Sequence, residues 1–151
     1  MIFNEKHYFC NTLTNERNFC KGKETSHTNS LQLMKRILIA EDNDSNYILM
    51  TYILKRSYEF FRAKNGQEAV DMANESDYDL VLMDIKMPIM DGLEATEKIR
   101  EAHPNLPIIA LTANAFDSDR QLAFKAGCNN FLSKPVSSDK CLAMIAKYIG
   151  E

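Results

Sequence analysis

The sequence feature that most limits the possible folds is a short apolar run, Leu80–Met83, that ends in one carboxylate, Asp84. A turn-rich loop, Ile85–Gly92, follows directly. An apolar run of this length between turn signals indicates a strand buried on both faces, as in parallel sheets covered by helices. Ligands bind beyond the carboxyl ends of such strands. We therefore expect Asp84, as the first residue past the strand, to face a site rather than the core.

Taken alone, Asp84 could be a turn residue that ends a strand. The rest of the chain argues against this, because apolar runs and amphipathic segments alternate from Lys35 onward. The expected strands are Arg36–Ala40, Tyr58–Ala63, Leu80–Met83, Pro107–Leu111 and Asn130–Leu132. The expected helices are Asn46–Arg56, Gln67–Glu75, Gly92–Ala102, Ser118–Ala126 and Ser138–Ile149, the first capped by Asp44 or Ser45.

Strands that alternate with helices in this way predict an α/β fold with a parallel sheet, helices on both faces and right-handed crossovers. The doubly wound strand order 2-1-3-4-5 places the first and third strands side by side at the switch point. Glu41 and Asp42 would then meet Asp84 in one cleft. Thr112 would follow the neighbouring strand, and Lys134 the edge strand beyond it.

Three carboxylates in one cleft repel each other unless a positive group joins them. The preferred partner is a hard divalent cation, and Mg²⁺ accepts carboxylates while keeping several waters. Lys134 supplies a compact positive charge and Thr112 a hydroxyl donor. Together these groups suit phosphoryl transfer onto a carboxylate, which would give an aspartyl phosphate.

Four segments together resemble the receiver domain of two-component response regulators. The amino-acid sequences of these segments are most similar to those of receivers of hybrid sensor histidine kinases. The resemblance covers about residues 35–151 and implies the five-stranded (βα)5 flavodoxin-like receiver fold. The segments are IAEDN at Ile39–Asn43, LMDIKMPIMDG at Leu82–Gly92, ALTANA at Ala110–Ala115 and FLSKP at Phe131–Pro135.

The resemblance also implies the roles of individual residues. Asp84 would be the phosphoacceptor, and Asp42, Asp84 and the backbone carbonyl of Lys86 would bind Mg²⁺ directly, with Glu41 acting mainly through a metal-bound water. Thr112 and Lys134 would contact the phosphoryl group, and the Lys134–Pro135 bond would be cis. Phe131 would be the switch aromatic, while Lys86 and Asn114 would tune dephosphorylation.

The resemblance implies a phosphorelay component rather than an enzyme with turnover. The chain would catalyse only its own phosphorylation and dephosphorylation at Asp84. The donor would be a histidine kinase or a histidine phosphotransfer protein, and the downstream protein target is open. We expect no effector domain after the last helix, so the output would pass through protein contacts.

Three other functions fit these residues less well. A phosphatase of the haloacid dehalogenase type would need a second Asp two residues after the nucleophile, where this chain has Lys86. A flavodoxin-like FMN carrier would need a neutral phosphate loop, but Glu41–Asp44 is acidic and would repel phosphate. A degenerate receiver used only for docking would normally have lost a site residue, and none is missing.

Residues 1–34 differ from the remainder, and we expect a flexible or loosely docked extension that is dispensable for folding. Residues 1–35 hold five Lys and Arg against three Asp and Glu, whereas residues 36–151 hold thirteen against eighteen. An acidic body argues against nucleic-acid binding. A zinc site from His7, Cys10, Cys20 and His27 is disfavoured by its spacing.

The remaining composition agrees with a cytoplasmic protein. The four cysteines of the chain fit reduced thiols better than a disulfide framework. No apolar stretch reaches the roughly 20 residues of a membrane span, and the N-terminus lacks a signal-peptide core.

Overall fold

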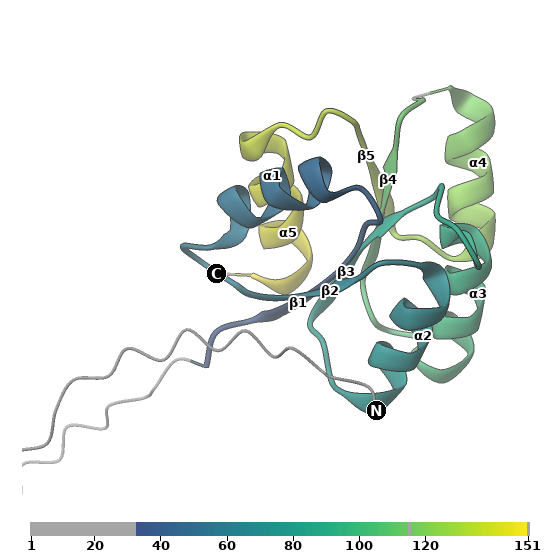
Figure 1. The fold of residues 1–151 in the computed structure, drawn as a ribbon, viewed down its shortest axis with the longest axis horizontal. Helices are drawn as coiled ribbons and strands as arrows, with labels where there is room; N and C mark the ends of the chain where they lie inside the picture. The colour runs from purple at the N-terminus through teal and green to yellow at the C-terminus, as the bar shows by residue number, and fades with distance from the viewer. Residues whose placement is uncertain (1–32, 115, 151) are drawn as a thin grey trace, which may run out of the picture. The chain divides into compact units, whose positions relative to one another are not determined.

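The computed structural model describes residues 33–114 and 116–150. The described residues form five strands and five helices in strict alternation (Figure 1). The strands are β1 Arg36–Ala40, β2 Glu59–Ala63, β3 Leu80–Asp84, β4 Ile108–Thr112 and β5 Asn130–Ser133. The helices are α1 Asp44–Leu54, α2 Gly66–Glu75, α3 Gly92–Ala102, α4 Asp117–Ala126 and α5 Ser138–Ile149.

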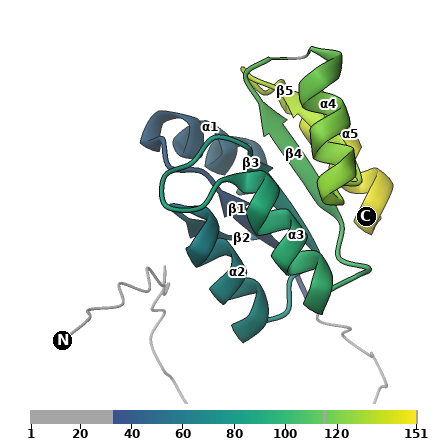
Figure 2. The ribbon, with the colours of Figure 1, turned by 90° about the vertical axis from the view of Figure 1, so that its right-hand side faces the viewer.

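The strands pair in parallel in the order β2-β1-β3-β4-β5, which confirms the predicted topology. Helices α1 and α5 cover one face of the sheet, and α2, α3 and α4 lie side by side on the other (Figures 1 and 2). Strands β3 and β4 are buried at every position, as the continuous apolar runs predicted. Each face has its own apolar cluster, one around Leu38, Val81 and Ile108 and the other around Ile37, Leu80 and Ile109.

Strand β1 and helices α3 and α5 have the predicted boundaries, and the boundaries of the other elements differ from the predictions by one to two residues. Asp84 was expected just past β3, but its Cα pairs with Leu111 of β4, so it is the last residue of the strand. Thr112 likewise belongs to β4, paired with Ser133. The prediction placed the end of each strand at its last apolar residue. The backbone pairing between strands continues for one more residue, whose side chain is polar.

The N-cap of α1 is also corrected. Asn43 caps the helix, since its Oδ1 accepts a hydrogen bond from the Asn46 N–H at 3.1 Å, and Asp44 and Ser45 lie inside the first turn. Asn65 and Asp91 cap α2 and α3 in the same way. These caps satisfy amide donors that have no partner within their helix.

The predicted extension 1–34 and the disfavoured zinc residues lie outside the described part of the chain, apart from the exposed Leu33 and Met34. Among the helices described, none combines the length and apolarity needed to cross a membrane.

Candidate functional site: an acidic cleft at the carboxyl edge of the sheet

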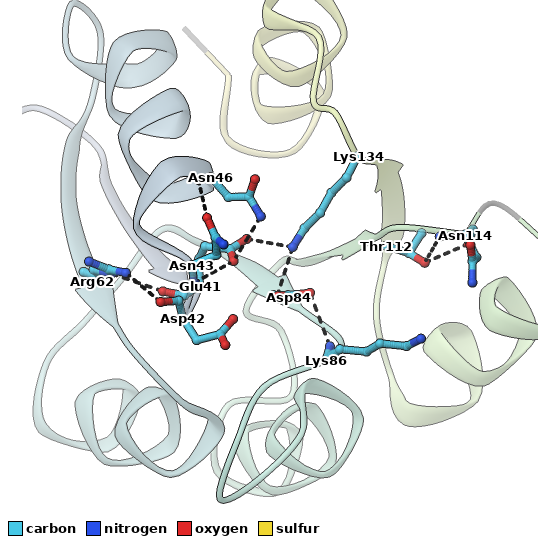
Figure 3. Close-up of polar contacts among 10 residues, drawn as sticks. All are labelled: Glu41, Asp42, Asn43, Asn46, Arg62, Asp84, Lys86, Thr112, Asn114 and Lys134. Carbon is cyan, nitrogen blue, oxygen red and sulfur yellow. Dashed lines mark hydrogen bonds and ion pairs between the residues drawn. The ribbon is translucent and has the colours of Figure 1, made fainter.

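The predicted acids meet where β1 and β3 end. Glu41, Asp42 and Asp84 each place a carboxylate oxygen within 4.8 Å of the others (Figure 3). The neighbouring positions of β1 and β3 bring the acids together, because Ala40 pairs with Met83, one residue before each acidic segment. They line a cleft of about 240 Å³ together with Asn46, Thr112, Asp119 and Lys134. The convergence predicted from strand order is therefore present.

Glu41 is fully buried, although it is a carboxylate. Its Oε1 accepts hydrogen bonds from the Asn43 N–H at 3.1 Å and from Asn46 Nδ2 at 3.4 Å. Its Oε2 lies 2.8 Å from Lys134 Nζ in an ion pair, although it has no partner with the angles of a hydrogen bond. A buried carboxylate is costly in free energy unless it is paired, and the Lys134 ammonium supplies that pairing here.

Asp84 is 5% exposed and closes β3. Its Oδ1 accepts the Lys86 N–H at 3.2 Å, and its Oδ2 lies 2.9 Å from Lys134 Nζ. Burial raises the pKa of Asp84 above its ordinary value, and the charge of Glu41 adds to this rise, although the hydrogen bond and charge of Lys134 oppose it. Burial lowers the pKa of Lys134, but its interactions with Glu41 and Asp84 outweigh burial and raise that pKa.

The loop from β3 to α3 folds back tightly against Asp84. The Gly92 N–H donates to the Ile85 carbonyl at 2.8 Å, and a Cβ at position 92 would overlap the Asp84 carbonyl. Ile89 has φ of 71°, and the Met90 N–H donates across it to the Pro88 carbonyl at 2.8 Å. Glycine at position 92 therefore permits the loop backbone to approach the Asp84 backbone closely.

Thr112 is buried at the end of β4, and its hydroxyl bonds to the backbone of Asn114 rather than to the acids. Its Oγ1 donates to the Asn114 carbonyl at 2.7 Å and accepts the Asn114 N–H at 3.2 Å. Phe131 of β5 is half-buried, with its ring edge-on to Phe124 at 6.3 Å and the Arg120 guanidinium 4.4 Å from its centroid. The Lys134–Pro135 bond is cis, as the resemblance implied.

Sequence reasoning missed two residues that order the acids. Asn46 contacts Glu41, and Arg62 donates to the backbone carbonyls of Glu41 and Asp42 (Figure 3). A signal for Arg62 was present, because a charged residue that follows two aromatic residues, one position before the end of a strand, needs a polar partner.

The donor set fits Mg²⁺. Hard oxygen ligands within reach of one another, one of them on a fully buried side chain, match what this cation prefers. Asp42 is exposed, so the cluster opens to solvent on one side and leaves room for waters.

The pattern of the response regulator receiver domain family matches residues 37–146. Hybrid signal transduction histidine kinase B of Dictyostelium discoideum is 39% identical over 85% of this chain, which spans 7% of that protein. The polar-differentiation response regulator DivK of Brucella anthropi is 38% identical over 78% of this chain and 98% of its own length.

Solved structures agree with the sequence relatives. The receiver domain of a sensor histidine kinase from Pseudomonas aeruginosa, which has a magnesium ion in its active-site cleft, superposes with a TM-score of 0.73 at 36% identity. The match covers 78% of this chain and 98% of that one.

The receiver domain of Saccharomyces cerevisiae Ssk1, crystallised with the histidine phosphotransfer protein Ypd1, gives a TM-score of 0.72 at 31% identity. That match covers 76% of this chain and 88% of the other. The family match, the relatives, the fold and the acidic cleft all agree. The chain belongs to the response regulator receiver domain family of two-component signalling.

Proposed function

We propose that Asp84 accepts a phosphoryl group from a phosphohistidine in a Mg²⁺-dependent transfer, and that the aspartyl phosphate then alters protein contacts. The phosphorus–nitrogen bond to the imidazole breaks while a bond to an Asp84 carboxylate oxygen forms, and the electron pair stays on the leaving imidazole. The observation that carries the proposal is the position of Asp84, buried among Glu41, Asp42 and the Lys134 ammonium.

The other groups of the cleft have supporting roles in the proposal. Asp42, Asp84 and the Lys86 carbonyl would hold Mg²⁺, and Glu41 would act through a water. Bound Mg²⁺ would neutralise charge on the phosphoryl oxygens. Lys134 would contact the phosphoryl group from the other side, and Thr112 would do so after its hydroxyl leaves Asn114. Phe131 would act as the switch aromatic, and Lys86 and Asn114 would tune the lifetime of the phosphate.

The phosphodonor would be a histidine kinase or a histidine phosphotransfer protein. This is supported by the Ssk1 receiver domain, which was crystallised with such a protein, and magnesium dependence by the receiver that holds the ion. We also propose that the chain has no turnover on other substrates and acts in the cytoplasm. The free, buried thiols of Cys128 and Cys141 fit a reducing compartment.

The proposal is tested by intact-protein mass spectrometry after treatment with acetyl phosphate. The wild type should gain one phosphoryl group in Mg²⁺ and none in EDTA, and Asp84→Asn should gain none. The control Asp71→Asn removes an exposed carboxylate on α2 and should leave the gain intact. An undiminished mass gain in Asp84→Asn or in EDTA would overturn the assignment.

A further inference from the structure

Arg62 of β2 reaches across to the loop that carries two of the acids. Its Nε and Nη2 donate to the backbone carbonyls of Glu41 and Asp42, both at 3.1 Å, and its Nη1 lies 2.7 Å from Asp44 Oδ1. The guanidinium carbon lies 4.4 Å from the centroid of the Tyr47 ring. One side chain therefore joins the end of β2 to the acidic segment from the end of β1 to the start of α1, and Figure 3 shows its contacts with Glu41 and Asp42.

These contacts provide donors for two backbone carbonyls that lie beyond the end of the β1–β2 ladder. The β1–β2 ladder ends with the pair Ala40 and Ala63, after which the Glu41 N–H donates to the Ala63 carbonyl at 3.0 Å. Beyond that point, the carbonyls of Glu41 and Asp42 have no partner in the β1–β2 ladder, and Arg62 donates to both, at a half-buried position for Glu41 and an exposed one for Asp42. The planar guanidinium supplies two parallel donors from one rigid group, which fixes both peptide units together.

The guanidinium is itself held in place. Its side chain is only 16% exposed, with the Tyr47 ring against it and Asp44 at its far end. Asp44 is 78% exposed, so this ion pair adds little free energy and contributes little to holding the guanidinium. The orientation therefore rests on the Tyr47 ring and the two carbonyls.

We infer that Arg62 is a positioning residue, which holds the peptide units of Glu41 and Asp42 so that their carboxylates are preorganised for a divalent cation. This inference rests on the proposed function, because it concerns the same Mg²⁺ site. Removal of groups behind the ligands of a metal site commonly weakens its affinity by roughly tenfold or more.

If Arg62 positions the acids, its removal should change Mg²⁺ affinity in the opposite direction from that expected if it acts only through its charge. A positive charge beside a cation site repels the cation, so removal of Arg62 would tighten Mg²⁺ binding if charge were its only effect. If Arg62 positions the acids, its removal weakens binding. The variant Arg62→Lys distinguishes the positioning role from the charge role further. Lysine keeps the positive charge, but its flexible side chain lacks the rigid paired donors of the guanidinium.

The experiment measures the Mg²⁺ dissociation constant by calorimetry for the full chain and for Arg62→Gln and Arg62→Lys. We expect both variants to bind roughly tenfold more weakly. With acetyl phosphate, both should need more Mg²⁺ for half-maximal phosphorylation but approach the wild-type rate at saturation. Amide chemical shifts of Glu41, Asp42 and Asn43 in EDTA should move in both variants.

Arg36→Lys is the matched control. Arg36 also stacks on aromatic rings, Phe61 and Tyr78, and donates to a carbonyl, that of Asp77, but it lies at the opposite end of β1. Its replacement should leave Mg²⁺ affinity unchanged. Tyr47→Leu should weaken Mg²⁺ binding by loosening Arg62, and Tyr47→Phe, which keeps the ring, should not.

Unchanged or tighter Mg²⁺ binding in Arg62→Gln, with Arg62→Lys equal to wild type, would overturn the inference. A lower melting temperature with an unchanged dissociation constant would show a structural role alone, which also overturns it. If Arg62→Gln does not fold, the Arg62→Lys and Tyr47 variants decide. Failure of the wild type to bind Mg²⁺ or to be phosphorylated would instead refute the proposed function.

Discussion

Lys134 Nζ lies 2.9 Å from Asp84 Oδ2 and, from the same position, 2.8 Å from Glu41 Oε2. One ammonium group thus bridges two acids that would otherwise repel each other in a buried cleft. Removal of one member of a buried charge cluster leaves the others uncompensated, which is more destabilising than the intact pair is stabilising.

We therefore expect Lys134→Met to lower the metal-free free energy of unfolding by about 3 kcal/mol. Mg²⁺ should restore more stability to this variant than to the wild type, which should gain about 1.4 kcal/mol at roughly ten times the dissociation constant. Urea unfolding in EDTA and in Mg²⁺ measures both. Lys86→Met is the control, because the exposed Lys86 side chain points away from Asp84 (Figure 3). Equal gains from Mg²⁺ in Lys134→Met and the wild type would contradict the bridging role.

Phosphorylation should change the face formed by α4, β5 and α5. Thr112 must release Asn114 to reach a phosphoryl group, and Phe131 would then turn inward from its place against Phe124 and Arg120. A ligand shifts such an equilibrium only by its differential contacts with the two states. Amide shift maps with and without beryllofluoride should show changes at Phe131 and α4, and these should be lost in Thr112→Val. Changes confined to the acidic cleft would refute the switch.

Ile89 should be a site of local strain. It is a β-branched residue with φ of 71°, at the centre of the turn closed by the Met90 N–H and the Pro88 carbonyl, and its side chain is 83% exposed. Ile89→Gly should raise the free energy of unfolding by up to about 1 kcal/mol, because glycine adopts positive φ without a Cβ clash. Ile89→Ala keeps the Cβ, so its free energy of unfolding, measured by chemical denaturation, should rise less than that of Ile89→Gly. A destabilised glycine variant would show that the turn carries no strain.

Cys141 should make the fold sensitive to alkaline pH. Burial raises the pKa of its thiol from 9.0 to about 11, so the fold favours the neutral thiol. The corresponding stability is fully present below the unfolded-state pKa and is lost as pH rises through the folded-state pKa, up to roughly 3 kcal/mol. Urea unfolding between about pH 8 and 11 should show a steeper loss for the wild type than for Cys141→Ala. Parallel pH profiles would contradict the assignment.

Residues 1–34 should be dispensable for folding and phosphorylation. Every described strand and helix begins after Lys35, and the family match begins at residue 37. A chain of residues 34–151 should therefore keep the melting temperature and the rate of Asp84 phosphorylation of the full chain. A melting temperature lower by several degrees, or a changed rate, would assign these residues a structural or regulatory role.

The sequence alone determined the order of elements and the convergence of the acids. Apolar runs such as Leu80–Met83 are local signals, and a sheet of known strand order places every strand end at one edge. Glu41, Asp42 and Asp84 could therefore be assigned to one cleft without coordinates. The same reasoning ended β3 one residue early, since side-chain polarity marks burial rather than the backbone ladder.

Tertiary structure alone decided how the polar groups are connected. The Asn43 cap depends on where the backbone turns helical, which neighbouring cap-forming residues leave ambiguous. Arg62 meets the acidic turn only because β1 and β2 pair in one particular register, and Lys134 bridges two acids only because β5 lies beyond β4. Thr112 turns toward Asn114 rather than Asp84 by the choice of a side-chain rotamer, which is set by packing and hydrogen bonding and has no signature in the order of residues.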